Sequence, residues 1–260
     1  MDLQKRNAEL VDQLKTDFVG RNEPNVAWGN AISNFLLLSG LRGFWPMSSY
    51  DQTGAAYDLS GQGRTLTYNG NPQYDGAGLF PWCSMDGTGD YLSRADEAGL
   101  DITGIEGLST FHQGLTMGGW YYFRNLASID DLIGKWITAN NKSYLLYKDN
   151  ANNLQFYMTT DGVTLKVVTS TIPAIANSWG WIVGRFTPGT ELAIWVNAVK
   201  TVNTTTIPAS IFSGTSPFQV GNGDGNTLDG AVSLQFLCAS ALSDAVINSL
   251  FHQTRAMFGV

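Results

Sequence analysis

The segment from Trp179 to Val196, WGWIVGRFTPGTELAIWV, decides the fold class. Two apolar runs rich in aromatic and β-branched residues, Trp179–Phe186 and Leu192–Val196, flank the turn signal Pro188-Gly189. Runs of this composition that are separated by a short turn are typical of paired antiparallel strands. The segment therefore predicts two neighbouring strands of an antiparallel sheet.

The same pattern of short apolar runs separated by turn signals extends from this segment over most of the chain. Strand-like alternation recurs at Leu115–Phe123, Ser143–Tyr147, Leu154–Met158, Val163–Val168 and Val232–Cys238. Turn signals such as Asn69-Gly70 and Asp161-Gly162 separate these runs. Strands at this spacing without helical patterns between them predict an all-β, antiparallel sandwich.

Composition limits the classes of function. The 260 residues include 29 Gly and 12% aromatic residues but only 14% charged ones, which suits many short strands joined by tight turns. The net charge of −7, with no cluster of Lys and Arg, repels phosphate backbones, so we expect no nucleic-acid partner. The apolar runs, among them Phe35–Leu38, are all too short to cross a bilayer, so we expect no membrane partner.

The N-terminal 18 residues have a helical pattern. Leu3, Leu10, Val11, Leu14 and Phe18 recur at spacings of three, four and seven, and Gly20 ends the pattern. Charges are scattered through this stretch and it has no apolar core like that of a secretory signal. We therefore expect synthesis in a host cytoplasm, with exit only by lysis or within a particle.

A second short helix is predicted to start at Glu23-Pro24 and to stop before Gly40, with Trp28, Ile32, Phe35 and Leu36 on one face. Two helices of this size hold no core alone, so their apolar stripes either fold back on the sandwich or meet another copy or another protein. The sequence favours the second option, because short apolar heptads at a terminus are a common oligomerisation device. We therefore predict an assembly segment over residues 1–40, with Leu3, Leu10, Leu14 and Phe18 as assembly residues and a homotrimer as the favoured oligomer.

Residues 41–260 form the predicted sandwich, which ends in a short helix. Ser243–Met257 has apolar residues at helical spacing after a Ser243-Asp244 cap. The two cysteines, Cys83 and Cys238, have no metal-finger spacing. They are interpreted as buried thiols, and a single disulfide between them stays open as the alternative.

Read in order, the strand-like segments resemble the laminin-G-like jelly-roll family within the concanavalin A-like lectin/glucanase superfamily. The resemblance covers residues 41–255 and rests on segments that keep the family's order: Leu41–Pro46, Tyr57–Arg64, Met85–Leu92, Leu115–Tyr121, Trp179–Asn197, Phe218–Gly221, Leu228–Val232 and Ala241–Asp244. One of these, Met-Asp-Gly-Thr-Gly-Asp-Tyr-Leu at 85–92, looks very like the family's Phe-Asp-Gly-x-Gly-Asp-Tyr-Leu strand, although it is the ordered set and no single segment that carries the resemblance. The resemblance implies a concanavalin A-like antiparallel jelly-roll sandwich, and this superfamily hosts lectins, hydrolases and structural domains alike.

The resemblance also implies a calcium site at the sandwich rim, because many laminin-G-like modules hold one ion there. Asp58, in its Ser-Gly turn, and Asp86 are the candidate ligands by position. The family's acidic pair in the last strand is replaced here by Ser233 and Leu234, which removes two charged ligands. Asp58 and Asp86 are then equally well explained as residues that cap turns through their side chains. No other cofactor is expected.

Catalysis has little support in the sequence. Glycoside hydrolysis needs two carboxylates on one sugar, roughly 5–10 Å apart. The five glutamates, Glu9, Glu23, Glu97, Glu106 and Glu191, show none of the Glu-x-Asp-x-x-Glu pattern of the glucanase branch. Only two histidines, His112 and His252, are present, and no Gly-x-Ser-x-Gly elbow is found. We expect the protein not to be an enzyme.

Two non-catalytic functions remain. The preferred interpretation is a structural or assembly protein, a phage virion component such as a capsid-decoration or head–tail protein, located in the virion with other virion proteins as partners. The alternative is a carbohydrate-binding module or receptor-binding adhesin, which needs exposed aromatic side chains near polar ones. Its candidate features are the polar loop at 221–226 and eight tryptophans, Trp28, Trp45, Trp82, Trp120, Trp136, Trp179, Trp181 and Trp195.

Overall fold

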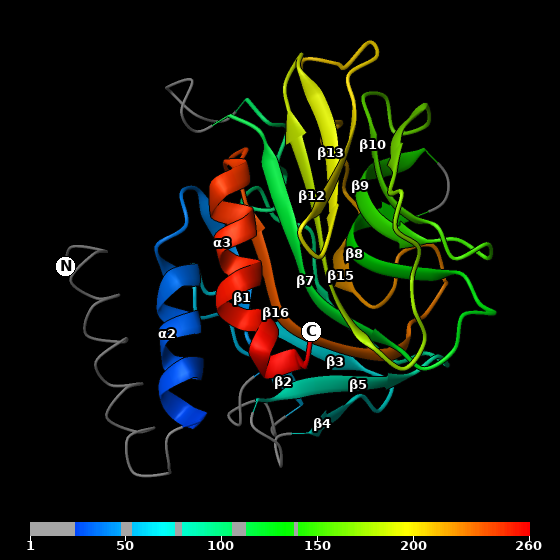
Figure 1. The fold of residues 1–260 in the computed structure, drawn as a ribbon. Coiled ribbons are helices and arrows are strands. Elements are labelled where there is room, and N and C mark those ends of the chain that lie inside the picture. The colour runs from blue at the N-terminus through cyan, green and yellow to red at the C-terminus, as the bar shows by residue number, and fades with distance from the viewer. Residues whose placement is uncertain (1–23, 48–53, 76–79, 106–112, 138–139) are drawn as a thin grey trace.

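Two antiparallel sheets packed face to face form the centre of the molecule (Figure 1). The computed structural model describes residues 24–47, 54–75, 80–105, 113–137 and 140–260. The first sheet, sheet A, has the order β14 (Val199–Asn203), β13 (Glu191–Val196), β12 (Trp179–Thr187), β7 (Leu115–Phe123), β16 (Asp229–Cys238), β5 (Trp82–Asp86) and β4 (Gln73–Asp75). A further strand, β1 (Leu41–Trp45), pairs with β16.

The second sheet, sheet B, has the order β11 (Leu165–Thr169), β10 (Leu154–Thr159), β9 (Asn141–Lys148), β8 (Asp130–Ile137), β15 (Phe218–Val220), β6 (Tyr91–Arg94), β3 (Leu66–Asn69) and β2 (Ala55–Ala56). Many of its strand neighbours are distant in sequence, as in a jelly roll, and all of its strand pairs are antiparallel. The predicted all-β sandwich is confirmed.

The central strands of sheet A are buried on both faces: β7, β12, β13 and β16. Along β12 the side chains alternate, so Ile182 and Phe186 enter the core between the two sheets while Trp181 and Val183 point to the outer side. The near-continuous apolar runs that the sequence shows in these strands follow from this double burial. The outer side requires a cover of its own.

Three helices supply that cover: α2 (Pro24–Leu36), α3 (Asp244–Thr254) and the 3₁₀ helix η3 (Arg255–Phe258). Figure 1 shows α2 and α3 side by side on one side of the sandwich. Trp120 of β7 ties α3 and η3 to the sheet, because its indole N–H donates to the Thr254 hydroxyl at 2.9 Å and its ring stacks on Phe258 at 4.3 Å. Ser243 caps α3 by accepting the N–H of Val246, as predicted.

Helix α2 packs on the sandwich, which corrects the expectation that its apolar face meets another molecule. Trp28, Ile32, Phe35 and Leu36 share one face as predicted, but all four are buried in the cluster between the helices and sheet A. Phe35 stacks on Phe44 of β1 with ring centroids 4.7 Å apart. A stripe with the same spacing serves an intramolecular contact as well as an intermolecular one, and sequence periodicity does not distinguish them.

The predicted assembly residues Leu3, Leu10, Leu14 and Phe18 lie outside the described residues, so the role of residues 1–23 and the division of the chain at residue 40 stay predictions. In the part of the chain that the structure describes, no helix is long and apolar enough to cross a membrane.

The two cysteines are buried and form no disulfide, and they lie on opposite faces of sheet A. Cys83 of β5 lies in the core between the sheets, whereas Cys238 of β16 lies under the helices. Cys83 pairs with Val232 of β16, six residues before Cys238, and six residues of strand span about 20 Å. A disulfide between them is therefore excluded by the fold.

We predict that Phe35→Ala lowers the free energy of unfolding by about 3–5 kcal/mol, since it empties a fully buried aromatic site. Leu37→Ala is the matched control. Leu37 lies two residues further along the chain, its side chain is 82% exposed, and we expect its removal to change the free energy of unfolding by less than about 0.5 kcal/mol. Chemical denaturation of the full chain measures both. Equal, small effects would contradict the packing of α2 on the sheet.

Candidate functional site

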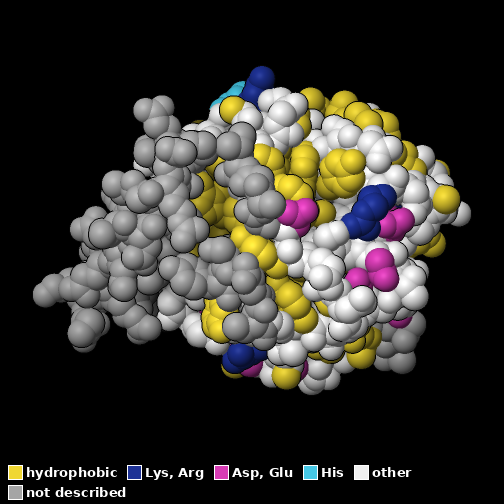
Figure 2. Space-filling view, turned by 90° about the horizontal axis from the view of Figure 1, so that it is seen from below, with side chains coloured by type: hydrophobic (Ala, Val, Ile, Leu, Met, Phe, Trp, Pro, Cys, Tyr) yellow, Lys and Arg dark blue, Asp and Glu magenta, His cyan; other side chains and the backbone are white. Residues whose placement is uncertain are grey.

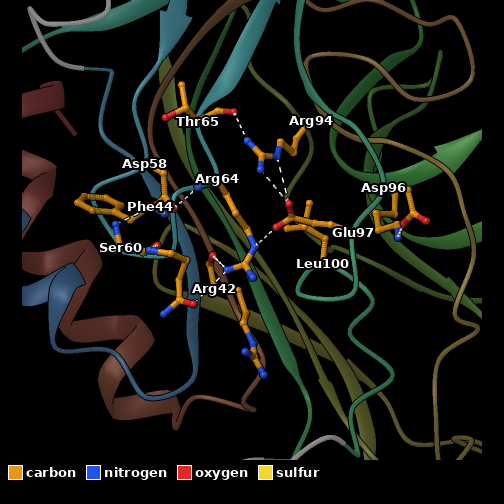
Figure 3. A network of polar contacts seen from close by, with 12 residues as sticks. Arg42, Phe44, Asp58, Ser60, Arg64, Thr65, Arg94, Asp96, Glu97 and Leu100 are labelled. Atoms are coloured by element: carbon orange, nitrogen blue, oxygen red, sulfur yellow. Dashed lines mark hydrogen bonds and ion pairs between the residues drawn. The ribbon is translucent and has the colours of Figure 1, made fainter. Parts of the chain in front are cut away.

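Asp58, one of the two calcium candidates, holds the turn between β2 and β3. One carboxylate oxygen accepts the backbone N–H groups of Phe44 at 3.0 Å and Ser60 at 2.9 Å, and the other accepts that of Arg64 at 2.8 Å. Figure 3 shows the carboxylate directed at these backbone groups. Both oxygens are thus engaged in fixing local backbone, which is the turn-capping role that the sequence left open.

Arg64 extends this network from the turn to Glu97 (Figure 3). The Glu97 carboxylate also forms an ion pair with Arg94, whose Nη2 lies 2.9 Å from Oε2 of Glu97. Partial burial raises the pKa of Glu97, but hydrogen bonds and positive charge from Arg94 and Arg64 outweigh it and hold that pKa below its usual range. A carboxylate held ionised by two guanidinium groups is unsuited to act as a catalytic acid.

Asp86, the second calcium candidate, is exposed at the end of β5 and accepts the N–H of Thr88 at 2.8 Å. Within the described ranges, no group of three or more His, Cys, Asp or Glu side chains is placed to hold a metal ion. Calcium at Asp58 and Asp86 stays a prediction, and the engagement of Asp58 with backbone gives it no support.

Glu191, another glutamate considered for catalysis, is neutralised by Arg185 and Lys200. Asp101, four residues after Glu97, pairs with the fully buried Lys135. His252 lies exposed on α3. Four further candidates lie outside the described residues: Glu9, Glu23, Glu106 and His112.

Burial separates the eight tryptophans into two groups. Six are buried: Trp28, Trp45, Trp120, Trp136, Trp181 and Trp195. The remaining two, Trp82 and Trp179, are partly exposed and lie on the same face of sheet A with ring centroids 6.2 Å apart. The prediction that exposed aromatic rings bind a sugar therefore narrows to this pair.

Trp82 and Trp179 belong to a cluster that we call the rim aromatic cluster, formed by Phe80, Trp82, Tyr122, Trp179 and Phe258. It occupies the outer face of sheet A where the helical cover ends at η3. Trp179 of β12 is the cross-strand partner of Tyr122 on β7, with centroids 5.6 Å apart, and it also packs on Phe258 at 5.0 Å. Strand pairing and η3 together fix the ring of Trp179.

A pocket of about 210 Å³ opens beside Trp179. Its walls come from the loop before β12, from β13 and from the chain end, and include Ile172, Ile175, Val196 and Val260. Figure 2 views the molecule from below. On the underside that it shows, hydrophobic side chains gather over the middle, with only a few charged groups beside them. The volume is below the roughly 300–1,000 Å³ of typical small-molecule sites, so the pocket admits a single ring-sized group.

Polar groups border the aromatic surface. The hydroxyl of Tyr122 donates to the side-chain oxygen of Asn177 at 3.4 Å. Asn197 lines the pocket and accepts the N–H of Trp181 through its side-chain oxygen at 3.0 Å, and Ser178 lines it as well. An apolar floor with a few fixed amide and hydroxyl groups is the arrangement that recognises a small polar ligand with one apolar face.

The polar loop at 221–226 lies elsewhere, over Asp131 of sheet B, whose carboxylate accepts the N–H of Asp224 at 2.8 Å. The sequence therefore named two tryptophans of the rim aromatic cluster, and a role of the loop at 221–226 in sugar binding stays a prediction for a separate part of the fold. The sequence missed the pocket, although Ile172 and Ile175 carry the signal, because they are apolar residues in a stretch without strand alternation.

We predict that Asp58→Ala costs about 3 kcal/mol of unfolding free energy, because three backbone N–H groups lose a charged acceptor. Asp86→Ala, which loses one exposed hydrogen bond, costs less than about 1 kcal/mol. Denaturation curves in chelator and in calcium measure both. A cost for Asp58→Ala that appears only in calcium would show a metal ligand in place of a turn cap.

Comparison with known proteins agrees with this architecture. The family model described as the concanavalin A-like lectin/glucanases superfamily matches residues 86–248, which is more than half of the chain. No curated protein sequence matches.

Solved structures resemble the fold at low identity. The binding domain of Paraclostridial Mosquitocidal Protein 1 superposes with a TM-score of 0.64 at 13% identity, over 82% of this chain and 52% of that one. The ligand-binding domain of botulinum neurotoxin serotype D, in complex with N-acetylneuraminic acid, gives 0.62 at 11% identity over 84% and 51%. The binding domain of botulinum neurotoxin DC, in complex with rat synaptotagmin II, gives 0.63 at 13% over 82% and 51%.

The present chain thus spans about half the length of the structures it matches. At this identity the likeness shows the fold alone. Together with the family match, it establishes that the chain belongs to the concanavalin A-like lectin/glucanase superfamily.

Proposed function

We propose that the chain is a non-catalytic recognition module of the lectin type, which binds a glycan at the rim aromatic cluster and the adjoining pocket. The observation that carries this proposal is Trp179, a partly exposed ring fixed between Tyr122 and Phe258 at the edge of the pocket. One apolar face of a sugar ring lies on Trp179, and its hydroxyl groups reach Asn197 and Ser178.

Rigidity supports this assignment. The ring of Trp179 contacts Phe80, Trp82, Tyr122 and Phe258, so little conformational freedom remains to be lost when a ligand binds. Aromatic side chains that combine a large apolar surface with a polar edge are the usual anchors of such sites.

The structural neighbours support a recognition role as a class. The three named above are described as binding domains, and two of them are complexes, one with a sialic acid and one with a protein receptor. Those chains are about twice as long as the matched region, so their ligands indicate only the kinds of partner to test, a glycan first and a protein receptor second.

The ion pairs of the acidic residues weighed for catalysis support a non-catalytic role. Glu97 and Glu191 are each paired with two cations, and Asp101 with one. Glycoside hydrolysis needs one carboxyl group that stays protonated near neutral pH beside a second that is ionised. None of these three described carboxylates lies in the pocket.

We predict that Trp179→Ala reduces binding to a responsive glycan on an array at least about fivefold, since stacking on one aromatic ring contributes on the order of 1–3 kcal/mol. Tyr157→Leu is the control, because Tyr157 is a partly buried aromatic residue of sheet B that does not line the pocket and whose ring stacks on Trp136 instead. It leaves glycan binding unchanged.

Binding that survives Trp179→Ala but is lost in Tyr157→Leu would transfer the site to sheet B. A folded protein that binds no glycan on a broad array would contradict the proposal altogether.

The second candidate is the assembly role, as a homotrimeric phage virion component with other virion proteins as partners. The apolar spacing of Leu3, Leu10, Leu14 and Phe18 supports it. Because the apolar face of α2 is buried against sheet A, this candidate assigns the oligomer contact to residues 1–23.

We predict for this candidate that removal of residues 1–23 converts an oligomer into a monomer while the sandwich stays folded, because α2 remains. Light scattering coupled to size exclusion measures the mass, with Leu10→Asp plus Leu14→Asp as a full-length comparison. A full chain that is already monomeric would remove the assembly role.

A further inference from the structure

Unpartnered oxygen atoms gather on the outer face of sheet B, where β8 meets β15. Asp131 is fully buried, and one of its carboxylate oxygens has no hydrogen-bond partner among the described residues. The side-chain oxygens of Asn222 and Gln219 are also buried without a partner in that part of the chain. Buried acceptors left unpaired are costly, so three in one region call for an occupant.

Strand register brings these residues together. Val220 of β15 pairs with Ile133 of β8, and the N–H of Gly221 donates to the carbonyl of Leu132 at 2.8 Å, which places Asn222 beside Asp131. Gln219 pairs with Gly134, and Asp131 pairs with Tyr147. Since Phe218, Val220 and Leu146 enter the core between the sheets, Gln219 and Tyr147 point to the outer face.

The loop at 221–226 closes over Asp131. The second carboxylate oxygen of Asp131 accepts the N–H of Asp224 at 2.8 Å and the side-chain amide of Asn226 at 3.1 Å. Gly223 passes so close that a Cβ there would lie 2.9 Å from that oxygen, so the position requires glycine. The loop is therefore built around the carboxylate, while the other oxygen stays free.

Among the described residues, no positive charge compensates this site. In the described part of the chain no ion pair includes Asp131 or Asp224, whereas the adjacent Asp130 is paired at 3.0 Å with the buried Lys148. Burial first, and the charge of Asp224 second, raise the pKa of Asp131 to about 6 against its hydrogen bonds. An ionised carboxylate in such surroundings favours a cation.

We propose that this site binds one calcium ion through the free oxygen of Asp131, the side-chain oxygen of Asn222 and the carboxylate of Asp224, with Gln219 as a further oxygen donor. The donors are all oxygen, as calcium prefers, and they include two carboxylates. The unpartnered atoms are too enclosed for a sugar ring, so the occupant is an ion or a water molecule. The excess of acceptors over donors, with two negative charges, selects the ion.

This site is distinct from the calcium candidates Asp58 and Asp86, and it is independent of glycan binding at the rim aromatic cluster. It shares no lining residue with the pocket. Its ligands come from β8 and from a loop about 90 residues later, so an ion there fastens the loop to sheet B.

The test is isothermal titration of calcium chloride into the chelator-treated full chain near pH 7.5. We expect one site with a dissociation constant in the range of about 0.1–1 mM, as for sites with few charged ligands. Asp131→Asn weakens binding at least about tenfold, and so does Asp224→Asn. Asp161→Asn is the control, because Asp161 is an exposed turn-capping carboxylate, and it leaves the affinity unchanged.

Asp131→Asn removes a buried charge at nearly constant volume, so we expect it to fold and to be at least as stable as the parent in chelator. Absence of binding heat from the folded parent would overturn the proposal and would leave a water molecule as the occupant. Calcium binding that neither Asp131→Asn nor Asp224→Asn weakens would also overturn it, because the ion would then lie elsewhere.

Discussion

Double burial of sheet A is the constraint on which the rest of the structure depends. A sheet of a two-layer sandwich normally leaves its outer face to water, and that face then reads as polar. Here the outer face carries Trp120, Trp181 and Trp195, so it must be covered. Helices α2, α3 and η3 provide the cover, and the point where η3 ends determines where aromatic rings of the same face become accessible. The candidate binding site is thus the uncovered end of a surface that is otherwise core.

Local sequence predicted the parts of the fold that local chemistry determines. The segment from Trp179 to Val196 forms β12 and β13 as expected, because β-branched and aromatic runs around Pro188-Gly189 leave few alternatives. Ser243 likewise predicted the start of α3, because a serine side chain at this position accepts a backbone N–H of the first helical turn. The partner of α2 was not predictable, since the periodicity of Trp28, Ile32 and Phe35 requires burial but does not say against what.

The sites depend on contacts between distant segments, and this limited what the sequence could show. Residue type indicated that tryptophans were candidates for sugar binding. The sequence does not show that Trp179 is accessible while Trp181, two residues later, is buried, because this depends on the strand register and on where η3 ends. Asp131 is unremarkable in sequence and becomes distinctive only when the loop at 221–226 closes over it. Asp58, which a motif made conspicuous, proves to serve the backbone of its own turn.

The account rests on α2 as an integral layer of the sandwich, and hydrogen exchange of the native full chain, followed by mass spectrometry, tests this most directly. If α2 covers sheet A as described, its backbone amides are exposed only when the sandwich unfolds, and they exchange at the rate of those in β7 and β16. Exchange of the α2 amides orders of magnitude faster, while β7 and β16 stay protected, would contradict the account. It would show a detachable helix and a sheet whose outer face is free.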